Sequence, residues 1–269
     1  MRFVYPNGLA KALTFSYDDG QIFDKRLADL FRQHGMKATF HLNSATLSRN
    51  PENTTFVGVD ELEQVYEGHE IACHGLQHRT PTTLSDQQLV QEILEDRREL
   101  ERLTGKFVQG MSYAFGNYDQ DVINIAKSLG IKYSRTVKNT DNFFPPENFM
   151  EWHPTCHHDG NLLELGDRFL NVPDYIELPL MYVWGHSFEF GRSGDWSVIE
   201  QFCEKMEGKK DIWYATNMEI YEYLTAIRNL ELSADGLSMY NPSAISVWVL
   251  ASGMNIEIPS GETVYIGEH

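Results

Sequence analysis

Segments with strand-like and helix-like apolar patterns alternate along this chain from about residue 10 to residue 228. Short apolar runs bounded by turn residues are typical of strands, whereas apolar residues that recur about every three to four positions are typical of helices. Repeated strand–helix units bring successive strands together in parallel. We therefore predict an α/β fold in which residues 1–228 form an irregular (β/α) barrel of about seven parallel strands.

Capping and turn residues mark the ends of several expected elements. Ser85 to Gln88 is a capping box, and the long helix that it opens is expected to end before Gly105. The other expected helices cover residues 23–34, 60–66, 119–129, 195–206 and 218–227. The expected strands cover residues 12–19, 37–42, 69–73, 107–113, 131–135, 182–186 and 211–215. Residues 137–176 lose this periodicity and are expected to form an insertion or a long loop.

The pattern changes at about residue 230. Four short alternating segments, separated by turn residues, predict strands at residues 237–240, 245–249, 255–258 and 263–266. About forty residues are too few for a robust core of their own. We therefore expect residues 229–269 to form a small antiparallel β appendage that packs on the barrel, as a structural flap or as a carbohydrate-binding element.

Composition excludes some classes of partner. The formal net charge is −17, which argues against binding to nucleic acid or to an anionic membrane surface, because both attract basic patches. Three widely spaced cysteines do not indicate a disulfide framework. No apolar N-terminal stretch indicates a signal peptide or a membrane span, so the expectation is a cytoplasmic protein. The oligomeric state cannot be read from the sequence.

Two adjacent aspartates, Asp18 and Asp19, end the first apolar run directly before Gly20. Neighbouring side chains at a strand end point in different directions, so one carboxylate can bind a cation while the other accepts a proton. Asp-Gly is also common turn chemistry, and a simple turn cap is the alternative interpretation.

Two histidines four residues apart, His74 and His78, follow another short apolar strand. This spacing lets two imidazoles bind one metal, although an isolated pair of this kind equally describes surface histidines. With one aspartate from the first strand end, they make a nitrogen and oxygen donor set. Such a set suits one divalent transition metal, most of all Zn²⁺, with Co²⁺, Ni²⁺ or Fe²⁺ as alternatives.

Together these motifs resemble those of the polysaccharide deacetylases with a NodB homology domain, also called carbohydrate esterase family 4. Residues 14–20 are similar to the family's Thr-Phe-Asp-Asp-Gly motif, with two residues inserted before the Asp pair. Residues 74–78 resemble its His-Ser/Thr-x-x-His motif. The resemblance extends over roughly residues 10–220 and indicates a divergent member of the family.

The resemblance also implies roles for individual residues. It implies that Asp18 is the catalytic base and that Asp19 binds the metal together with His74 and His78. The family's late Leu-x-His motif is similar to the end of the segment 182–186. It implies that His186 is the acid that protonates the leaving group.

Other motifs of the family are only partly present. Residues 112–116 resemble the Arg-x-Pro-Tyr-Gly motif, but Ser112 replaces the arginine that accompanies the base. The surviving aromatic position, Phe115, is implied as a backbone donor to the oxyanion. Arg135, at the end of the next expected strand, is the candidate to replace the missing arginine and orient the base. Gly75 stands where the family has Ser or Thr, and the fourth motif, an Asp and a Trp that orient the acid histidine, has no clear match.

Aromatic and histidine-rich segments near these motifs have alternative interpretations. Tyr113, Trp184 and Phe188 are candidates to contact substrate. The aromatic residues around His186, which include Trp184 and Phe188, could equally close the barrel core. Residues 152–160 contain histidines and a cysteine, fit no zinc spacing, and are expected to form a substrate-facing or solvated loop.

The function implied by the resemblance is metal-dependent removal of N-acetyl groups from an amino-sugar-containing oligo- or polysaccharide, which releases acetate. The sugar and the chain length are not determined. One alternative is an amidase of the same fold that acts on a small non-sugar amide or ureide. Another is a carbohydrate-binding protein that has lost turnover. Acetate release from N-acetylated oligosaccharides distinguishes the three.

Overall fold

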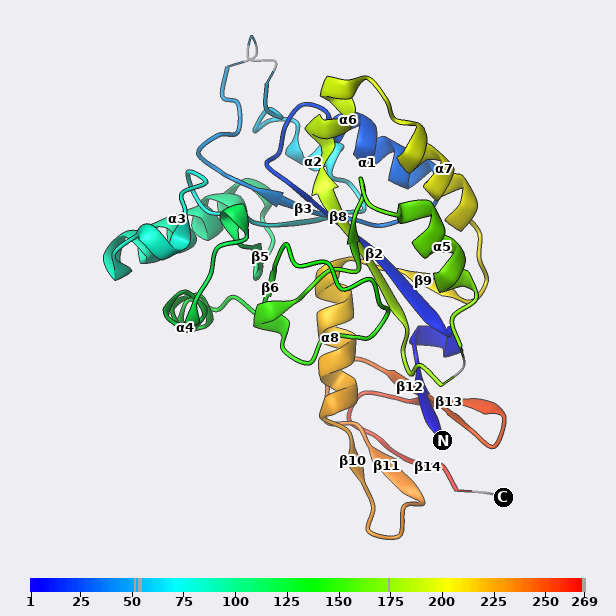
Figure 1. Cartoon of the computed structure of the whole chain (residues 1–269). Coiled ribbons are helices and arrows are strands. Elements are labelled where there is room, and N and C mark those ends of the chain that lie inside the picture. The colour runs from blue at the N-terminus through cyan, green and yellow to red at the C-terminus, as the bar shows by residue number, and fades with distance from the viewer. Residues whose placement is uncertain (51, 53–54, 174, 268–269) are drawn as a thin grey trace.

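One parallel sheet lies at the centre of the protein (Figure 1). The computed structural model describes residues 1–269 except residues 51, 53–54, 174 and 268–269. The strand order is β6-β5-β4-β3-β2-β8-β7, and β9 also pairs with β2. These strands are β2 (Lys11–Asp18), β3 (Thr39–Leu42), β4 (Glu70–Cys73), β5 (Gly110–Ser112), β6 (Tyr133–Arg135), β7 (Cys156–His157), β8 (Leu180–His186) and β9 (Ile212–Tyr214). The curled sheet of parallel strands confirms the predicted barrel architecture.

Helices flank this sheet, and each helix predicted from the sequence is present. They are α1 (Asp24–Gln33), α2 (Leu62–Val65), α3 (Asp86–Thr104), α4 (Gln120–Ser128), α5 (Leu162–Leu170), α6 (Ser187–Ser193), α7 (Ser197–Met206) and α8 (Asn217–Arg228). The capping box of α3 forms, because Ser85 accepts from the N–H of Gln88, and Gly105 ends the helix at φ +67°. No helix within the described residues is long and apolar enough to cross a lipid bilayer.

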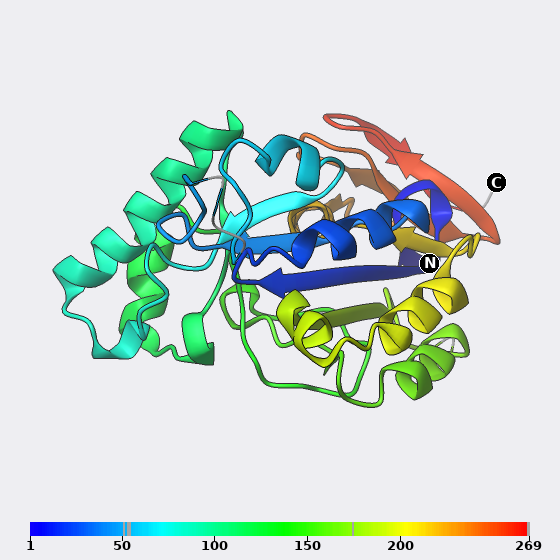
Figure 2. The same ribbon diagram turned by 90° about the horizontal axis from the view of Figure 1, so that it is seen from above.

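The two faces of β2 separate the core from the site. Phe15 packs outward against Phe31 of α1 and Phe202 of α7, with ring centroids 4.3 and 5.9 Å apart. Figure 2 shows α1 and α7 alongside this central strand. Because side chains alternate along a strand, Ser16 and Asp18 point to the other face, the barrel interior. Both contact the guanidinium of Arg135 there.

β2 is a regular strand that pairs with the whole length of β8. β2 pairs with β8 residue for residue, from Ala12 with Leu180 to Asp18 with His186, so there is no bulge. The same register brings the carboxyl ends of the two strands together.

The segment 137–176 is an integral part of the barrel rather than an insertion or a long loop. It contains β7, α5 and a short 3₁₀ helix, Phe149–Glu151. Trp152 bridges to Arg135 of β6, and Cys156 pairs with Val183 of β8, so the segment closes the sheet between these strands. A two-residue strand is too short to show a period. The helix α5, however, has a recognisable apolar spacing, with Leu162, Leu165, Gly166 and Phe169 buried.

The same segment corrects the interpretation of residues 152–160 as a substrate-facing or solvated loop. Trp152, Cys156 and His158 are buried within it, at 1%, 1% and 0% exposure. The three cysteines, Cys73, Cys156 and Cys203, are all buried and free.

The C-terminal residues form two small antiparallel sheets rather than one. The first is ordered β1-β12-β13 and the second β10-β11-β14. Their strands are β1 (Arg2–Val4), β10 (Glu231–Leu232), β11 (Ser238–Tyr240), β12 (Val247–Ala251), β13 (Met254–Ile258) and β14 (Thr263–Tyr265). The N-terminal β1 takes the free edge of β12, so the first sheet combines both ends of the chain (Figure 1).

Helix α8 joins these sheets to the barrel. The hydroxyl of Tyr223 donates to the carbonyl of Val4 and accepts from the N–H of Trp248. At the other end of α8, Asn217 accepts from Thr14 of β2 and donates to the hydroxyl of Tyr182 in β8. Residues 229–269, of which 268–269 lie outside the described residues, thus pack on the barrel through one helix and the N-terminal strand.

Candidate active site

Asp18 and Asp19 point in different directions because the chain turns at Asp19. Asp19 has φ +84°, in the left-handed region that Asp adopts more readily than most residues. Asp18, the last residue of β2, stays inside the barrel with 2% of its surface exposed. Asp19 turns instead toward His74 and His78.

Asp19, His74 and His78 place three donor atoms within metal-binding reach of one another. The two Nε2 atoms lie 3.1 Å apart, and each lies 3.6 Å from Asp19 Oδ1. Ligands that surround zinc tetrahedrally at about 2.0–2.2 Å lie roughly 3.3–3.6 Å from one another. Asp19 Oδ1 is buried and has no hydrogen-bond partner among the described residues. The three residues therefore fit a divalent transition metal.

Ser112 orients the buried His74. The Nδ1 atom of His74 lies 3.1 Å from the carbonyl oxygen of Ser112, which can only accept, so we assign the ring proton to Nδ1. The lone pair of Nε2 is then free for a metal. The hydroxyl of Ser112 lies 2.6 Å from the same Nδ1 and donates to Asp18 Oδ1 at 3.1 Å. A neighbouring strand thus supplies the support that Gly75 cannot give.

Two buried acids of α3 hold the loop that carries the histidines. Glu92 Oε1 accepts from the N–H groups of Gln77 and Arg79 at 2.8 and 3.1 Å. Asp96 Oδ2 accepts from the N–H of His74 at 3.1 Å. Burial raises the pKa of Asp96 to about 7, although hydrogen bonds from Ser44 and from the N–H of His74 oppose the shift. Helix α3 therefore fixes the backbone of the loop that carries the two histidines.

Arg135 lies against Asp18, in the place of the family arginine that Ser112 replaces in this sequence. Its guanidinium donates to Asp18 Oδ2 and, through Nε, to the hydroxyl of Ser16 at 3.0 Å. The indole ring of Trp184 covers it at 4.5 Å. Burial alone would raise the pKa of Asp18, but Arg135 and then His74 outweigh it and hold that pKa well below its usual range. Asp18 is thus kept ionised.

His186 ends β8 beside Asp18, and Glu189 of α6 faces it. Glu189 Oε2 accepts from the N–H of His186 at 3.1 Å and lies 3.4 Å from its Nδ1. Burial lowers the pKa of His186, but Glu189 and Asp18 raise it by more than burial lowers it. The pKa of His186 therefore stands above its ordinary value. Sequence comparison did not predict Glu189. The available signal was an acid three residues after His186, at the third position of a helix.

The remaining predicted site residues differ in their access to solvent. Tyr113 is 1% exposed and its hydroxyl donates to the carbonyl of Met150, so its proposed role in substrate binding is wrong. Trp184 is mostly buried over Arg135. Phe188 is partly exposed, with its ring 4.9 Å from that of His186. Phe115 is 60% exposed at φ +58°, and its ring lies 4.3 Å from that of His78.

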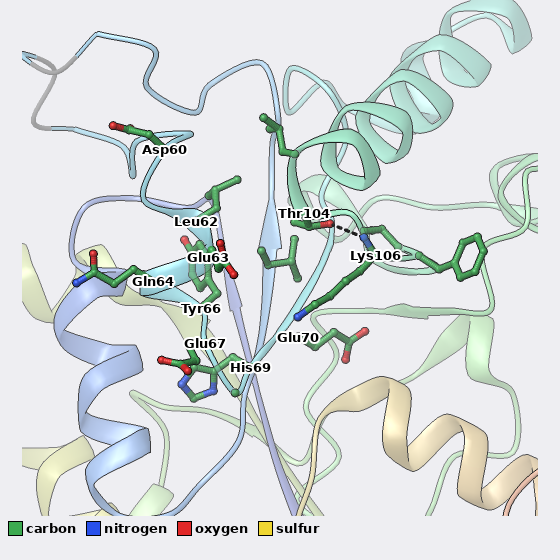
Figure 3. A pocket seen from close by; sticks show the side chains of 15 residues that line it. Asp60, Leu62, Glu63, Gln64, Tyr66, Glu67, His69, Glu70, Thr104 and Lys106 are labelled. Carbon is green, nitrogen blue, oxygen red and sulfur yellow. Dashed lines mark hydrogen bonds between the residues drawn. The ribbon is translucent and has the colours of Figure 1, made fainter.

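A cavity of about 750 Å³ lies away from these residues (Figure 3). It is bounded by α2, by the end of α3 and by the amino ends of β4 and β5. Glu70, the first residue of β4, lines it, whereas His74 follows the last residue of that strand. Active sites of parallel barrels are built at the carboxyl ends of the strands. The cavity therefore lies at the opposite end of the sheet from the candidate site.

The first half of the chain matches a known protein family. Residues 6–134 match the family model described as polysaccharide deacetylase. The chain is 24% identical over 135 residues to the peptidoglycan-N-acetylglucosamine deacetylase PgdA of Listeria monocytogenes. It is 30% identical over 94 residues to a peptidoglycan-N-acetylglucosamine deacetylase of Bacillus cereus. These matches cover 49% and 34% of this chain, but only 27% and 41% of the two relatives.

Solved structures match most of the chain in fold. A Mycobacterium smegmatis protein provisionally described as a polysaccharide deacetylase superposes with a TM-score of 0.64 at 17% identity, covering 85% of this chain and 95% of its own. The peptidoglycan deacetylase PdaC of Bacillus subtilis gives 0.55 at 16% identity, covering 84% and 95%. At such identities the likeness concerns the fold alone.

Proposed function

Because this chain is a divergent member of the polysaccharide deacetylase family, we propose that it is a metal-dependent hydrolase that removes N-acetyl groups from an amino-sugar polymer. The substrate tested first is a polymer that contains N-acetylglucosamine, since the matched relatives act on peptidoglycan. One observation carries the proposal. An Asp-His-His donor set, an ionised carboxylate and a histidine of raised pKa converge at one end of the barrel.

The donor set of Asp19, His74 and His78 is the proposed metal site. A divalent transition metal bound there would polarise an acetyl carbonyl and make water more acidic. The residues around it hold the donors in place. Ser112 fixes the tautomer of His74, and α3 fixes the loop between the two histidines. Three protein ligands leave coordination positions open, as hydrolytic sites require.

Asp18 is the proposed general base. It is ionised because Arg135 lies against Oδ2, so it can take the proton of an attacking water. Its Oδ1 is held by the hydroxyl of Ser112, which fixes the direction of the carboxylate.

His186 is the proposed general acid. A departing amine needs a proton, because an amide nitrogen is a poor leaving group without one. The carboxylates of Glu189 and Asp18 favour the protonated imidazole, so His186 is able to hold that proton until the C–N bond breaks. In this mechanism Glu189 takes the orienting role of the unmatched fourth motif.

Acetate release tests the proposal. The purified protein is incubated with chitin oligosaccharides and with N-acetylated peptidoglycan fragments, before and after a chelator and again after addition of Zn²⁺. We expect acetate to be released, to cease on metal removal and to resume with Zn²⁺. Release of amine from small amides alone would favour the amidase, and sugar binding without any release would favour a binding protein. Either result contradicts the proposal.

Replacement of Arg135 by Met should shift the pH dependence of the reaction. Without the guanidinium, burial raises the pKa of Asp18, so Asp18 becomes protonated at higher pH. The acidic limb of the pH–rate profile should therefore move upward, with a lower maximal rate and with metal still bound. Arg135→Lys is the control, since it keeps the positive charge and should restore much of the limb. An acidic limb unmoved by Arg135→Met would show that Arg135 does not keep Asp18 ionised.

A further inference from the structure

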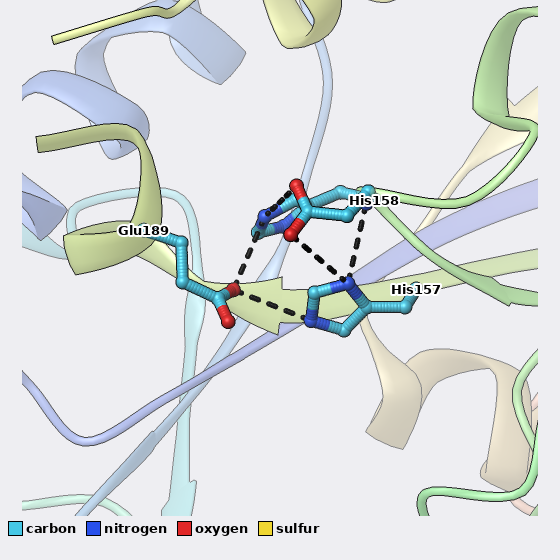
Figure 4. A group of neighbouring side chains, drawn as sticks. His157, His158 and Glu189 are labelled. Carbon is cyan, nitrogen blue, oxygen red and sulfur yellow. Dashed lines mark hydrogen bonds and ion pairs between the residues drawn. The ribbon is translucent and has the colours of Figure 1, made fainter. Parts of the chain in front are cut away.

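A second group of metal-binding side chains lies beside the proposed site and shares no ligand with it. It consists of His157, His158, Asp159 and Glu189, each of which offers an atom within 4.8 Å of the others. The first three follow one another at the end of β7, and Glu189 comes from the first turn of α6 (Figure 4). We call these four residues the His157–Glu189 cluster.

His158 is held rigidly in the cluster. Its ring is 0% exposed and stacks between the rings of Tyr17 and Phe190, with centroids 5.7 and 4.1 Å away. Gly185 of β8 leaves room for it, because a Cβ at that position would lie 2.0 Å from His158 Nδ1. An imidazole fixed in this way cannot turn to find other partners.

The nitrogens of this buried ring make no hydrogen bond of regular geometry among the described residues. Neither Nδ1 nor Nε2 of His158 has a hydrogen-bond partner among the described residues. Nε2 nevertheless lies 3.1 Å from Glu189 Oε2 and 3.2 Å from Asp159 Oδ1. Figure 4 shows the carboxylate of Glu189 turned toward both His157 and His158. A buried imidazole that faces two carboxylates without regular hydrogen-bond geometry indicates that a further group joins them.

The spacing fits a transition metal. His157 Nε2 lies 3.2 Å from Glu189 Oε2, so the short contacts of the cluster span 3.1–3.2 Å. This is close to the roughly 3.3 Å expected between tetrahedral ligands about 2.0 Å from a zinc ion.

We infer that the His157–Glu189 cluster binds a second divalent transition metal ion, of the Zn²⁺ class, through two imidazoles and two carboxylates. The site is accessible for loading, since the side chain of Asp159 is 66% exposed and that of Glu189 is 28% exposed. An ion there would hold Glu189 in the position from which it faces His186. The inference rests on the cluster alone and does not depend on the proposed deacetylase activity.

Metal counting in matched variants tests this inference. The metal-free protein is titrated with Zn²⁺, and bound metal per chain is measured after removal of excess. We expect two ions per chain in the wild type, one in His78→Ala and one in Glu189→Gln, and neither in the double variant. Asp159→Asn should lower the affinity for the second ion by at least about tenfold, because it removes a charged ligand. Glu164→Gln, an exposed acid on α5, is the control and should keep two.

Three results would overturn the inference. The first is that the wild type binds only one ion and that His78→Ala removes it. This result would leave the proposed function intact. The second is unchanged stoichiometry and affinity in both Glu189→Gln and Asp159→Asn. The third is that both of these variants lose the second ion but also lose the native circular dichroism spectrum, so that the metal is lost through unfolding. Retention of one ion in His78→Ala that Glu189→Gln then removes would support the cluster, whatever the activity assay shows.

Discussion

Replacement of His78 by Ala should remove the metal of the proposed active site and abolish acetate release. Two donors cannot complete the coordination of a transition metal, and even outer partners of metal ligands change affinity about 10- to 100-fold. We therefore expect Zn²⁺ affinity at this site to fall at least about a hundredfold. His78 is the variant of choice because its side chain is 27% exposed, whereas His74 is buried and its removal could disturb the core.

Metal content and acetate release are measured together in this experiment. His34→Ala is the matched control, since His34 follows α1 and pairs with Glu207 far along the chain. It should retain wild-type metal and rate. Full metal content at the active site in both His74→Ala and His78→Ala would mean that these histidines are not its ligands.

Replacement of Asp18 by Asn should separate catalysis from metal binding. Asn keeps the shape of the side chain but cannot accept a proton, and loss of a general base costs about 10²- to 10⁴-fold in rate. Metal content should stay near that of the wild type, because the three ligands are unchanged. Asp19→Asn should instead lose both metal and rate, since it removes the charged ligand.

Turnover numbers and metal content of both variants are compared with those of Asp121→Asn, an exposed acid on α4. The assignment of base and ligand would be reversed if Asp19→Asn kept its metal while Asp18→Asn lost it.

Local patterns in the sequence predicted most of the barrel. The alternation of apolar residues along β2 and the capping box of α3 are short-range signals, and both are found as expected. The strand β7 was not predicted because it has only two residues. The division of the C-terminal strands into two sheets was not predicted either, because β1 pairs with β12, more than 240 residues away in the sequence. Pairing between distant edges leaves no local period.

The sequence also indicated most members of the candidate site, because strand ends of a parallel barrel meet at one face. Asp18, Asp19, His74, His78 and His186 each end or follow an apolar run, and the structure brings them together. Among their immediate neighbours, Arg135 was predicted from its place at the end of the next strand, whereas Glu189 was not. Glu189 follows the last strand of the site on α6, a helix that the sequence analysis did not predict.

The sequence places acids and histidines directly after its apolar runs, and therefore at the carboxyl ends of the strands. Which of these charged groups touch depends on the tertiary structure. Arg135 reaches Asp18 across the barrel interior from β6, and Ser112 joins Asp18 to His74 from β5. These contacts depend on the curvature of the sheet and on side-chain reach, which a linear pattern does not record. For the same reason, no sequence pattern shows that the buried His158 lies between the carboxylates of Asp159 and Glu189.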